Sequence, residues 1–559
     1  MASRVVVIGL DGGTYDLLLP LIEQGHMPQL AQVLQNGGWG CLESTIPPFT
    51  ASAWSTFATG KNPGQHGVLS FQQFDRFNYH ECVTGFNDAR QLQQPLWEML
   101  SAAGKRVAVL NIPLSYPPQP VNGIMITGMM TPADAPEFTY PLELADALTD
   151  YRIDVDFIRD GDSFRRYGLP EKSEMLADIY KVTQERTAVS LRLLEQELWD
   201  FFMVVYTGTD RISHFFWDDL QPLWDKRPLS SSKKSIYFPD LIAYFHKLDR
   251  DISQLIDAAG PDAHVFFMSD HGFGSSPTKR FSVNLWLEQQ QLLSPNQPQN
   301  ASSLAYWRMK VGRNPLLKKA LRRLMSQELQ DKLAHKAETQ LNGTNIVWSH
   351  TQAYFVPIYF HVCGIEVNTV GEHREGIVSS DEKYEAIRTQ IITDAQQIRD
   401  PETGEHIVEL VVRREDMYRG SYMSQFPDVI LLLKPEYVGG QSLAGSELIE
   451  PYTPFRPGEH RPDGIFAAIG PYVQQFANLP NLQLADVAPT ILYLLGLPVP
   501  TNFDGRILQE LITPEHWAMV PPQYKKTMNK TEAVELNPIY SEDEEAELIE
   551  RLRSLGYME

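Results

Sequence analysis

Aspartate and histidine residues follow several short apolar runs in the 559-residue sequence. The set consists of Asp11, Asp210, His214, Asp270 and His271, together with His460, which is expected in a loop before the apolar run Ile465–Ile469. Carboxylate oxygens and imidazole nitrogens together suit Zn²⁺ or Mn²⁺. Three aspartates and three histidines are enough for two metal sites that each keep a position open for substrate or water. Two divalent ions about 3.5–4 Å apart can stabilise both the attacking and the leaving oxygen of a phosphoryl displacement. The set therefore predicts a two-metal site for phosphate chemistry.

The spacing within the set is informative for two pairs. Asp210 and His214 are four residues apart, which places both side chains on one face of a helical turn. Asp270 and His271 are adjacent, and adjacent side chains of a strand point to opposite faces, so the chain must turn there. Gly272 permits such a turn. Taken singly, these residues are equally a turn aspartate, a helix cap or an inert histidine, so the prediction depends on the whole set.

A candidate nucleophile lies in the segment from Thr45 to Gly67. Pro47 and Pro48 break regular structure, and a helix is expected to begin near Thr50. A hydroxyl at a helix N-terminus faces free backbone N–H groups and the positive end of the helix dipole, which favours a bound phosphate. The alternative is that Thr50 only caps the helix.

These residues depend on strands that position them. Short apolar runs, which are typical of buried strands, are Val5–Leu10, Val107–Leu110, Phe201–Tyr206, Val265–Met268, Val429–Leu433 and Ile465–Ile469. Helical patterns lie between several of them. The alternation predicts an α/β fold, with a mostly parallel central sheet and helices on both faces. In such sheets, ligands bind at the carboxyl ends of the strands, where several of the candidate ligands follow.

We expect one catalytic domain that carries insertions and an extension. Residues 1–300 form its N-terminal part, and residues 346–512 form the remainder, which includes the last metal ligand. Residues 301–345 are locally basic with an apolar stripe. They are expected to form a helical insertion, either a solvated subdomain or a lid, beside small α+β insertions. Residues 513–559 form a C-terminal extension, with a short helix that begins at the acidic run after Ser541.

The composition excludes several partners. A formal net charge of −22 repels nucleic acid and anionic membrane surfaces. The three cysteines form no CxxC pattern, which argues against a disulfide framework and favours a reducing compartment. No apolar stretch approaches the ~20 residues of a membrane span, and Val5–Leu10 is too short for a signal peptide. We expect a cytoplasmic protein that acts on a small phosphorylated substrate. We expect it to bind no nucleic acid and to insert into no membrane stably. The sequence leaves open whether the protein forms a homo-oligomer.

The segment around the candidate nucleophile resembles the motif of the type I phosphodiesterase and nucleotide pyrophosphatase group, within the alkaline phosphatase superfamily. In that motif a Thr precedes a Thr-Gly pair by nine positions, and Pro and His-Gly follow. The matching residues are Thr50, Thr59-Gly60, Pro63 and His66-Gly67. The six candidate ligands match the superfamily in order. The late segment Ala485–Pro498, followed by Asp504-Gly505, is similar to its C-terminal helix.

The resemblance implies an alkaline phosphatase-like fold and a role for each residue. One metal ion would be held by Asp11, Asp270 and His271 and would bind the Thr50 oxygen, and the other by Asp210, His214 and His460. The ions, Zn²⁺ before Mn²⁺ or Mg²⁺, would activate the Thr50 hydroxyl as a nucleophile. Attack on phosphorus would give a phosphothreonine that water hydrolyses. Lys61 and Asn62 are further candidates for contacts to the substrate.

The expected function is hydrolysis of phosphate monoesters or diesters by a two-metal enzyme. One alternative is a metal-dependent phosphomutase on the same scaffold, and another is a metal- or phosphate-binding protein that has lost catalysis. Nucleotide pyrophosphatases place an Asn three residues after the nucleophile, where this chain has Ala53. The resemblance therefore does not extend to nucleotide specificity.

Overall fold

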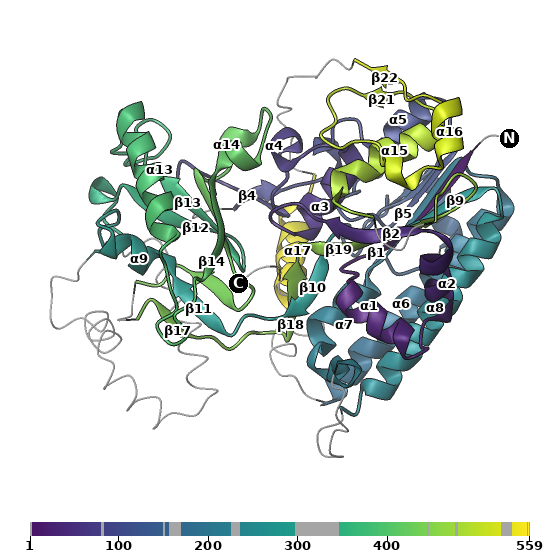
Figure 1. Cartoon of the computed structure of the whole chain (residues 1–559), viewed down its shortest axis with the longest axis horizontal. Coiled ribbons are helices and arrows are strands. Elements are labelled where there is room, and N and C mark those ends of the chain that lie inside the picture. The colour runs from purple at the N-terminus through teal and green to yellow at the C-terminus, as the bar shows by residue number, and fades with distance from the viewer. Residues whose placement is uncertain are drawn as a thin grey trace. The chain divides into compact units, whose positions relative to one another are not determined.

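Strands rich in Val, Ile and Phe form a nine-stranded central sheet in this computed structural model (Figure 1). Its strands, in spatial order, are β20 (Leu482–Gln483), β2 (Gly38–Glu43), β19 (Asp463–Ile469), β9 (Ala263–Met268), β1 (Arg4–Leu10), β8 (Phe201–Tyr206), β5 (Val107–Leu110), β6 (Gly123–Ile126) and β7 (Thr139–Tyr140). The run from β9 to β6 is parallel throughout. Antiparallel pairs involve β19 and β7. The predicted mostly parallel α/β sheet is confirmed.

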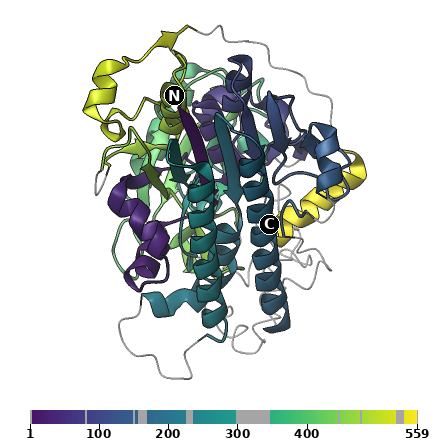
Figure 2. The ribbon, with the colours of Figure 1, turned by 90° about the vertical axis from the view of Figure 1, so that its right-hand side faces the viewer.

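Helices cover both faces of this sheet, which explains why its strands are apolar without alternation. The long helices α6 (Leu169–Gln196) and α8 (Phe238–Ala259) pack side by side on one face (Figure 2). On the other face lie α3 (Thr50–Thr59) and α15 (Val487–Leu494) (Figure 1). All six residues of β8 are buried, as are all six of β9.

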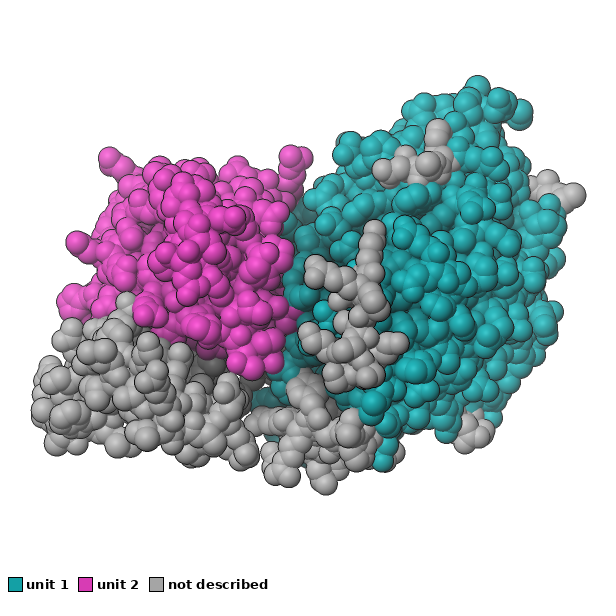
Figure 3. All heavy atoms as spheres, turned by 60° about the horizontal axis from the view of Figure 1, so that its bottom comes forward, with its two compact units in different colours: residues 1–71, 87–275, 455–559 teal, residues 72–86, 276–454 magenta. Residues whose placement is uncertain are grey.

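The chain divides into two compact units, each with its own core (Figure 3). Unit 1 comprises residues 1–71, 87–275 and 455–559 and holds the central sheet. Unit 2 comprises residues 72–86 and 276–454. The described residues are 3–79, 83–148, 151–155, 169–224, 235–296, 346–443, 447–475, 479–526, 539–555 and 557. The predicted helical insertion at 301–345 lies outside them. No helix among them is long and apolar enough to cross a membrane.

Unit 2 contains a four-stranded antiparallel sheet. Its strands are β12 (Ala353–Tyr359), β13 (Val362–Val367), β15 (Val429–Leu433) and β14 (Val408–Arg413), and the helix α13 (Asp381–Ala395) packs on them. The apolar run Val429–Leu433 is therefore a buried strand, as predicted, but it belongs to this sheet. A run of five buried residues reports burial on both faces and does not identify the sheet that the strand joins.

The helix α3, which begins at Thr50, ends at Gly60 in a left-handed conformation with φ 63°. A Cβ atom at Gly60 would lie 2.4 Å from the ring of Phe503. The carbonyl of Gly60 also accepts a hydrogen bond from the backbone N–H of Asp504 at 2.9 Å. The Thr-Gly pair of the motif thus anchors the end of α3 to the segment around Asp504.

We predict that Gly60→Ala destabilises unit 1 more than Gly25→Ala does. Gly25 also has a positive φ of 77°, but nothing lies within 4 Å of the position that its Cβ would take. Both variants lose about 1–2 kcal/mol from the left-handed backbone, and only Gly60→Ala adds about 1–3 kcal/mol for the contact with Phe503. Thermal unfolding followed by near-ultraviolet circular dichroism measures the difference. Equal midpoints for the two variants would contradict the packing argument.

Candidate active site

The carboxyl ends of three neighbouring parallel strands bring the three aspartates to one edge of the central sheet. Asp11 follows β1 directly, and its backbone N–H donates to the carbonyl of Tyr206, the last residue of β8. Asp210 lies in the first turn of α7 (Gly208–Phe216), which follows β8. Asp270 comes two residues after the end of β9. All three carboxylates are buried.

The three histidines lie at the same edge of the sheet but belong to different secondary-structure elements. His214 lies one turn after Asp210 on α7, so the predicted spacing of four is confirmed as one helical face. His460 lies in the short strand β18 (Gly458–Arg461), which pairs with β10 (Gly272–Ser275) immediately after His271. The sequence pattern predicts a loop at His460. Its position is instead fixed by an antiparallel ladder.

One group of side chains gathers around the ring of His271. Its Nε2 lies 3.2 Å from an Asp270 oxygen, 3.9 Å from an Asp11 oxygen and 3.3 Å from the Thr50 hydroxyl. Asp11, Asp270 and His271 each offer a ligand atom, and these atoms all lie within 4.8 Å of one another. The predicted first group, with Thr50 beside it, is assembled in the structure.

A second group gathers around Asp210. Its Oδ1 lies 3.4 Å from the Nε2 of His214 and 3.4 Å from the Nε2 of His460. These two nitrogens are 2.9 Å apart. The rings of His271 and His460 stack with centroids at 3.5 Å, so the two groups are contiguous. The six predicted ligands thus form one buried cluster.

All three imidazole rings are oriented by backbone carbonyl groups. The Nδ1 atoms of His214, His271 and His460 lie 3.0, 3.1 and 2.9 Å from the carbonyl oxygens of Gly458, Gly272 and Pro48. A carbonyl only accepts, so each Nδ1 donates, and a neutral ring then presents the lone pair of Nε2 to the cluster. The facing Nε2 atoms of His214 and His460 both present lone pairs, and a cation between them removes their repulsion.

Each aspartate has one oxygen held by a donor and the other left toward the cluster. Asp11 Oδ2 accepts from Trp54 Nε1 at 3.0 Å, Asp270 Oδ1 accepts from the Gly12 N–H at 3.1 Å, and Asp210 Oδ2 accepts from Arg211 Nη1 at 2.5 Å. The other oxygens, Asp11 Oδ1, Asp210 Oδ1 and Asp270 Oδ2, are buried without a hydrogen-bond partner. Buried carboxylate oxygens without donors are costly unless a cation binds them, so this donor set fits metal ions.

Burial shapes the charge state of the metal-free cluster. Desolvation, reinforced by the Asp210 carboxylate, raises the pKa of Asp11 well above its usual value, and desolvation and Asp11 do the same for Asp270. Desolvation also lowers the pKa values of His214 and His271, with further contributions from neighbouring Arg456 and His460, respectively. Neutral imidazole is the form that binds a metal ion, so the histidines are prepared for it.

Thr50 occupies the first position of α3, and Phe49 caps that helix with an extended backbone. The first N–H groups of the helix have no carbonyl of the preceding turn to bind, and they point out from its N-terminus. The predicted placement of the hydroxyl at a helix start is confirmed. The cap role itself is excluded, because Phe49 is the N-cap and makes no side-chain cap bond.

Lys61 and Asn62 lie in the turn between α3 and α4 (Pro63–His66). Asn62 accepts from the Gly64 N–H at 2.8 Å, and its Nδ2 donates to Asp504 at 2.7 Å. Burial lowers the pKa of Lys61, while Asp504 opposes this effect. These contacts give Asn62 a role in holding the turn, and substrate contacts of either residue stay a prediction.

Four residues around the cluster are absent from the sequence-based prediction: Trp54, Arg211, Arg456 and Tyr557. Arg211 carries a local signal, because it is a fully buried cation beside Asp210 in a helix whose nine residues are all buried. Arg456 pairs with Glu459 at 2.8 Å, next to His460. The ending Leu555-Gly556-Tyr557 is part of the sequence resemblance, but the spacing assigns Tyr557 no role, since it reaches Asp210 from 347 positions along the chain.

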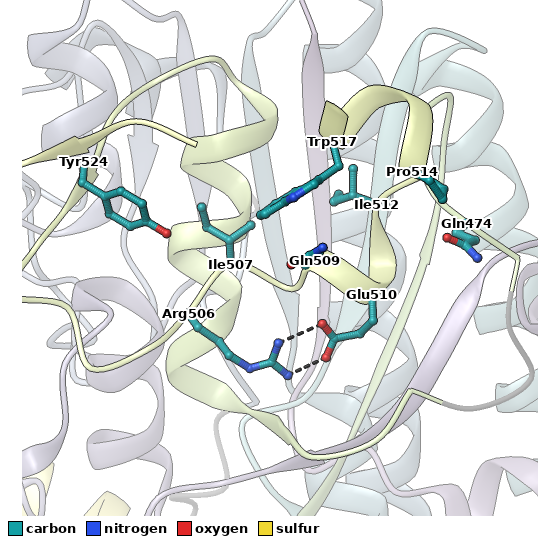
Figure 4. A pocket seen from close by; sticks show the side chains of 9 residues that line it. All are labelled: Gln474, Arg506, Ile507, Gln509, Glu510, Ile512, Pro514, Trp517 and Tyr524. Atoms are coloured by element: carbon teal, nitrogen blue, oxygen red, sulfur yellow. Dashed lines mark hydrogen bonds and ion pairs between the residues drawn. The ribbon is translucent and has the colours of Figure 1, made fainter. Parts of the chain in front are cut away.

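A separate hollow of about 560 Å³ lies elsewhere in unit 1 (Figure 4). Its lining includes Trp517, Tyr524 and the ion pair of Arg506 with Glu510. None of the six candidate ligands is among its lining residues. The hollow is therefore separate from the candidate active site, which lies at the cluster.

A cluster of buried carboxylates and imidazoles at the carboxyl edge of a mostly parallel sheet is the arrangement expected for a metal-dependent hydrolase. Residues 5–447 match the model of the type I phosphodiesterase/nucleotide pyrophosphatase family. The chain belongs to this family, and the family match makes it a phosphoester hydrolase. The predicted resemblance is confirmed.

Two solved structures are similar to this chain at low identity. Phosphonoacetate hydrolase from Sinorhizobium meliloti 1021, in complex with phosphonoformate, is 14% identical with a TM-score of 0.49, over 89% of this chain and 95% of that chain. Murine ectonucleotide pyrophosphatase/phosphodiesterase 5, in complex with AMP, is 12% identical with a TM-score of 0.49, over 91% of this chain and 100% of that chain. No curated protein matches the sequence significantly.

We predict that the metal-free wild-type chain takes up two divalent ions and that His460→Ala takes up one. The Asp210 group loses a nitrogen ligand in this variant, while the Asp11 group keeps its three ligands. Elemental analysis after gel filtration measures the stoichiometry, with the exposed His350→Ala as the matched control, which should bind two. Saturating Zn²⁺ should also stabilise the wild type by about 2.7 kcal/mol at 100 times its Kd. Equal stoichiometry in all three proteins would contradict the assignment.

Proposed function

We propose that this chain hydrolyses phosphate monoesters or diesters with two bound divalent cations and Thr50 as the nucleophile. The observation that carries the proposal is the pair of facing Nε2 atoms of His214 and His460, 2.9 Å apart, with both rings fixed by backbone carbonyls. Two lone pairs at this distance need a cation. The three partnerless oxygens of the aspartates point to the same conclusion.

We assign the six ligands to the two ions as the resemblance implies. Asp11, Asp270 and His271 would hold the ion beside Thr50, and Asp210, His214 and His460 would hold the other. Zn²⁺ suits this mixture of carboxylates and imidazoles best, and Mn²⁺ or Mg²⁺ are the alternatives. When bound, the ions supply positive charge that lowers the pKa of a nearby hydroxyl and stabilises the charge of a phosphoryl transition state.

Thr50 is placed to form the covalent bond. Its hydroxyl lies 3.3 Å from the Nε2 of His271 and is fully buried. In the proposed reaction, the deprotonated Thr50 oxygen attacks phosphorus, a P–O(Thr50) bond forms, and the bond from phosphorus to the leaving alcohol breaks. The free N–H groups at the start of α3 bind the phosphoryl oxygens through this step. A water molecule then attacks from the vacated side, which restores the hydroxyl and releases phosphate or a phosphomonoester.

A phosphomutase would use the same side chains but would return the phosphoryl group to the substrate. Such an enzyme must exclude water after the first step. The phosphohydrolase is preferred because the family is one of phosphodiesterases and pyrophosphatases. Ala53 lies in the first turn of α3, where nucleotide pyrophosphatases have an Asn. Because Ala53 has no side-chain amide to donate to a phosphate oxygen, a nucleotide is not the expected substrate.

The proposed setting is the cytoplasm, with a small phosphorylated molecule as the partner. The net charge of −22 disfavours nucleic acid and anionic membranes, so anion binding would depend on the positive charge that ions bound at the cluster supply. Two free cysteines, exposed Cys41 and buried Cys363, fit a reducing compartment.

The test is hydrolysis of p-nitrophenyl phosphate and bis-p-nitrophenyl phosphate, with Zn²⁺ or Mn²⁺ added to the metal-free chain. Thr50→Ala should lower kcat by a factor on the order of 10³ or more, because the nucleophile is lost, while both ions still bind. Thr50→Ser keeps a hydroxyl and should retain activity. The ester that turns over faster defines the substrate class.

The control for these variants is Thr513→Ala. Thr513 precedes α16 (Pro514–Met519) and makes no side-chain cap bond, so its hydroxyl is dispensable. Its activity should equal that of the wild type. Metal-loaded wild type that hydrolyses neither ester, but transfers the phosphoryl group between positions of a sugar phosphate, would favour the mutase. Full activity of Thr50→Ala would refute the proposed nucleophile.

A further inference from the structure

The segment from Tyr540 to Tyr557 packs onto unit 1 through the amphipathic helix α17 (Glu542–Ser554). The helix begins with a capping box in which Ser541 and Glu544 bind each other's backbone N–H groups. Apolar residues one turn apart on one face are fully buried, namely Leu548, Leu552 and Leu555. The segment is therefore part of the folded unit.

The loop after β6 holds this segment in place. The hydroxyl of Tyr540 donates to the carbonyl of Met130 at 3.1 Å, and Arg551 Nη1 donates to the carbonyl of Thr131 at 2.8 Å. These contacts join parts of the chain that are more than 400 positions apart. They fix the direction in which the last turn of α17 points.

Arg456 connects the last turn of α17 with the ligand cluster. The guanidinium of Arg456 is fully buried, donates to the carbonyl of Leu555 and forms an ion pair with Glu459 at 2.8 Å. The backbone N–H of Tyr557 donates to the carbonyl of Leu552 at 2.8 Å. One buried cation therefore connects the end of α17 with the residue that precedes His460.

The side chain of Tyr557 then enters the cluster itself. Its hydroxyl donates to Asp210 Oδ2 at 3.3 Å and accepts from Arg211 Nη1 at 3.0 Å. This is the oxygen of Asp210 that faces away from His214 and His460. The hydroxyl and Arg211 hold Oδ2 together, so Oδ1 is left toward the two histidines.

The ring of Tyr557 contacts both the nucleophile segment and the ligands. It meets the rings of Phe49 and Phe71 edge to face, with centroids at 5.6 and 5.5 Å. The rings of His214 and His460 lie at 5.9 and 6.0 Å. Phe49 is the N-cap of α3, next to Thr50.

We propose that Tyr557 is a positioning residue of the catalytic centre, delivered by α17, which orients Asp210, His214 and His460 for the second cation. The inference rests on the proposed function, because it needs the cation that these three ligands would hold. Groups that orient metal ligands typically change metal affinity or activity by 10–100-fold when they are removed. The hydroxyl of Tyr557 acts on Asp210 through a hydrogen bond, and its ring limits the rotation of the two imidazoles.

The test compares the wild type with Tyr557→Phe and with Tyr493→Phe, all as full chains stripped of metal. Tyr557→Phe removes only the hydroxyl and keeps the ring packing. Tyr493→Phe removes a hydroxyl that donates to the carbonyl of Val520 at 2.8 Å, instead of to a ligand or to the segment that carries Tyr557, so it is the matched control. Zn²⁺ is titrated in competition with a chromophoric chelator, and the Kd of each ion is obtained.

The wild type and Tyr493→Phe should bind two ions with the same two affinities. Tyr557→Phe should keep one affinity and weaken the other about 10-fold or more, with an unchanged melting temperature of the metal-free chain. The retained affinity should equal that of the single ion in His460→Ala, which identifies the weakened ion as the one at Asp210. The kcat for the preferred ester should fall in parallel.

Two outcomes would overturn this inference alone. One is a Tyr557→Phe variant with both affinities and kcat equal to those of the wild type. The other is a variant in which both ions weaken equally and the melting temperature falls, since that pattern shows a general structural role. A wild type that binds no second ion would overturn the inference together with the proposed function, so the two failures are distinguishable.

Discussion

The rest of this structure depends on one constraint, which is the burial of several carboxylates close together in the protein interior. Three buried aspartates face one another across the edge of a sheet, and two imidazole lone pairs meet at 2.9 Å. Burying unpaired charges costs many kcal/mol, so such an arrangement persists only if positive charge enters with it. The buried guanidinium groups of Arg211 and Arg456 supply part of this charge from behind the ligands. In the proposed function, bound ions supply the rest, which would make folding and ion binding two aspects of one equilibrium.

Hydrogen bonds from the surrounding protein orient the ligand side chains. Each carboxylate must turn one oxygen inward, and each ring must expose the correct nitrogen. An indole N–H, a backbone N–H and a guanidinium hold the outward oxygens, while three backbone carbonyls hold the Nδ1 atoms. Three of these six partners, Gly12, Gly272 and Gly458, lie at strand ends or in the turn after a strand. The other three, Trp54, Arg211 and Pro48, lie on α3, on α7 and just before α3. Strand ends and helices together therefore orient the ligands.

The fold class and the six candidate ligands were accessible from the sequence because both leave local patterns. A buried strand is an apolar run, and Asp11, Asp210 and Asp270 follow such runs within four residues. The helix start at Thr50 followed in the same way from the prolines before it. The run Val429–Leu433 showed the limit, since burial alone does not assign a strand to a sheet. Arg456 and Tyr557 received no role from the sequence, because the contacts of Arg456 with Leu555 and of Tyr557 with Asp210 join distant parts of the chain.

The ladder between β10 and β18 has a consequence for how this chain tolerates change. It pairs Ser275 with Gly458 and Gly272 with Arg461, directly beside the ligands His271 and His460. The chain that departs after Ser275 returns at Phe455, and the intervening residues 276–454 belong to unit 2, which has sheets of its own. The ladder within unit 1 therefore sets the distance between His271 and His460 without the help of the intervening polypeptide. That polypeptide is free to lengthen, shorten or be exchanged during evolution while the distance between the two ligands stays constant.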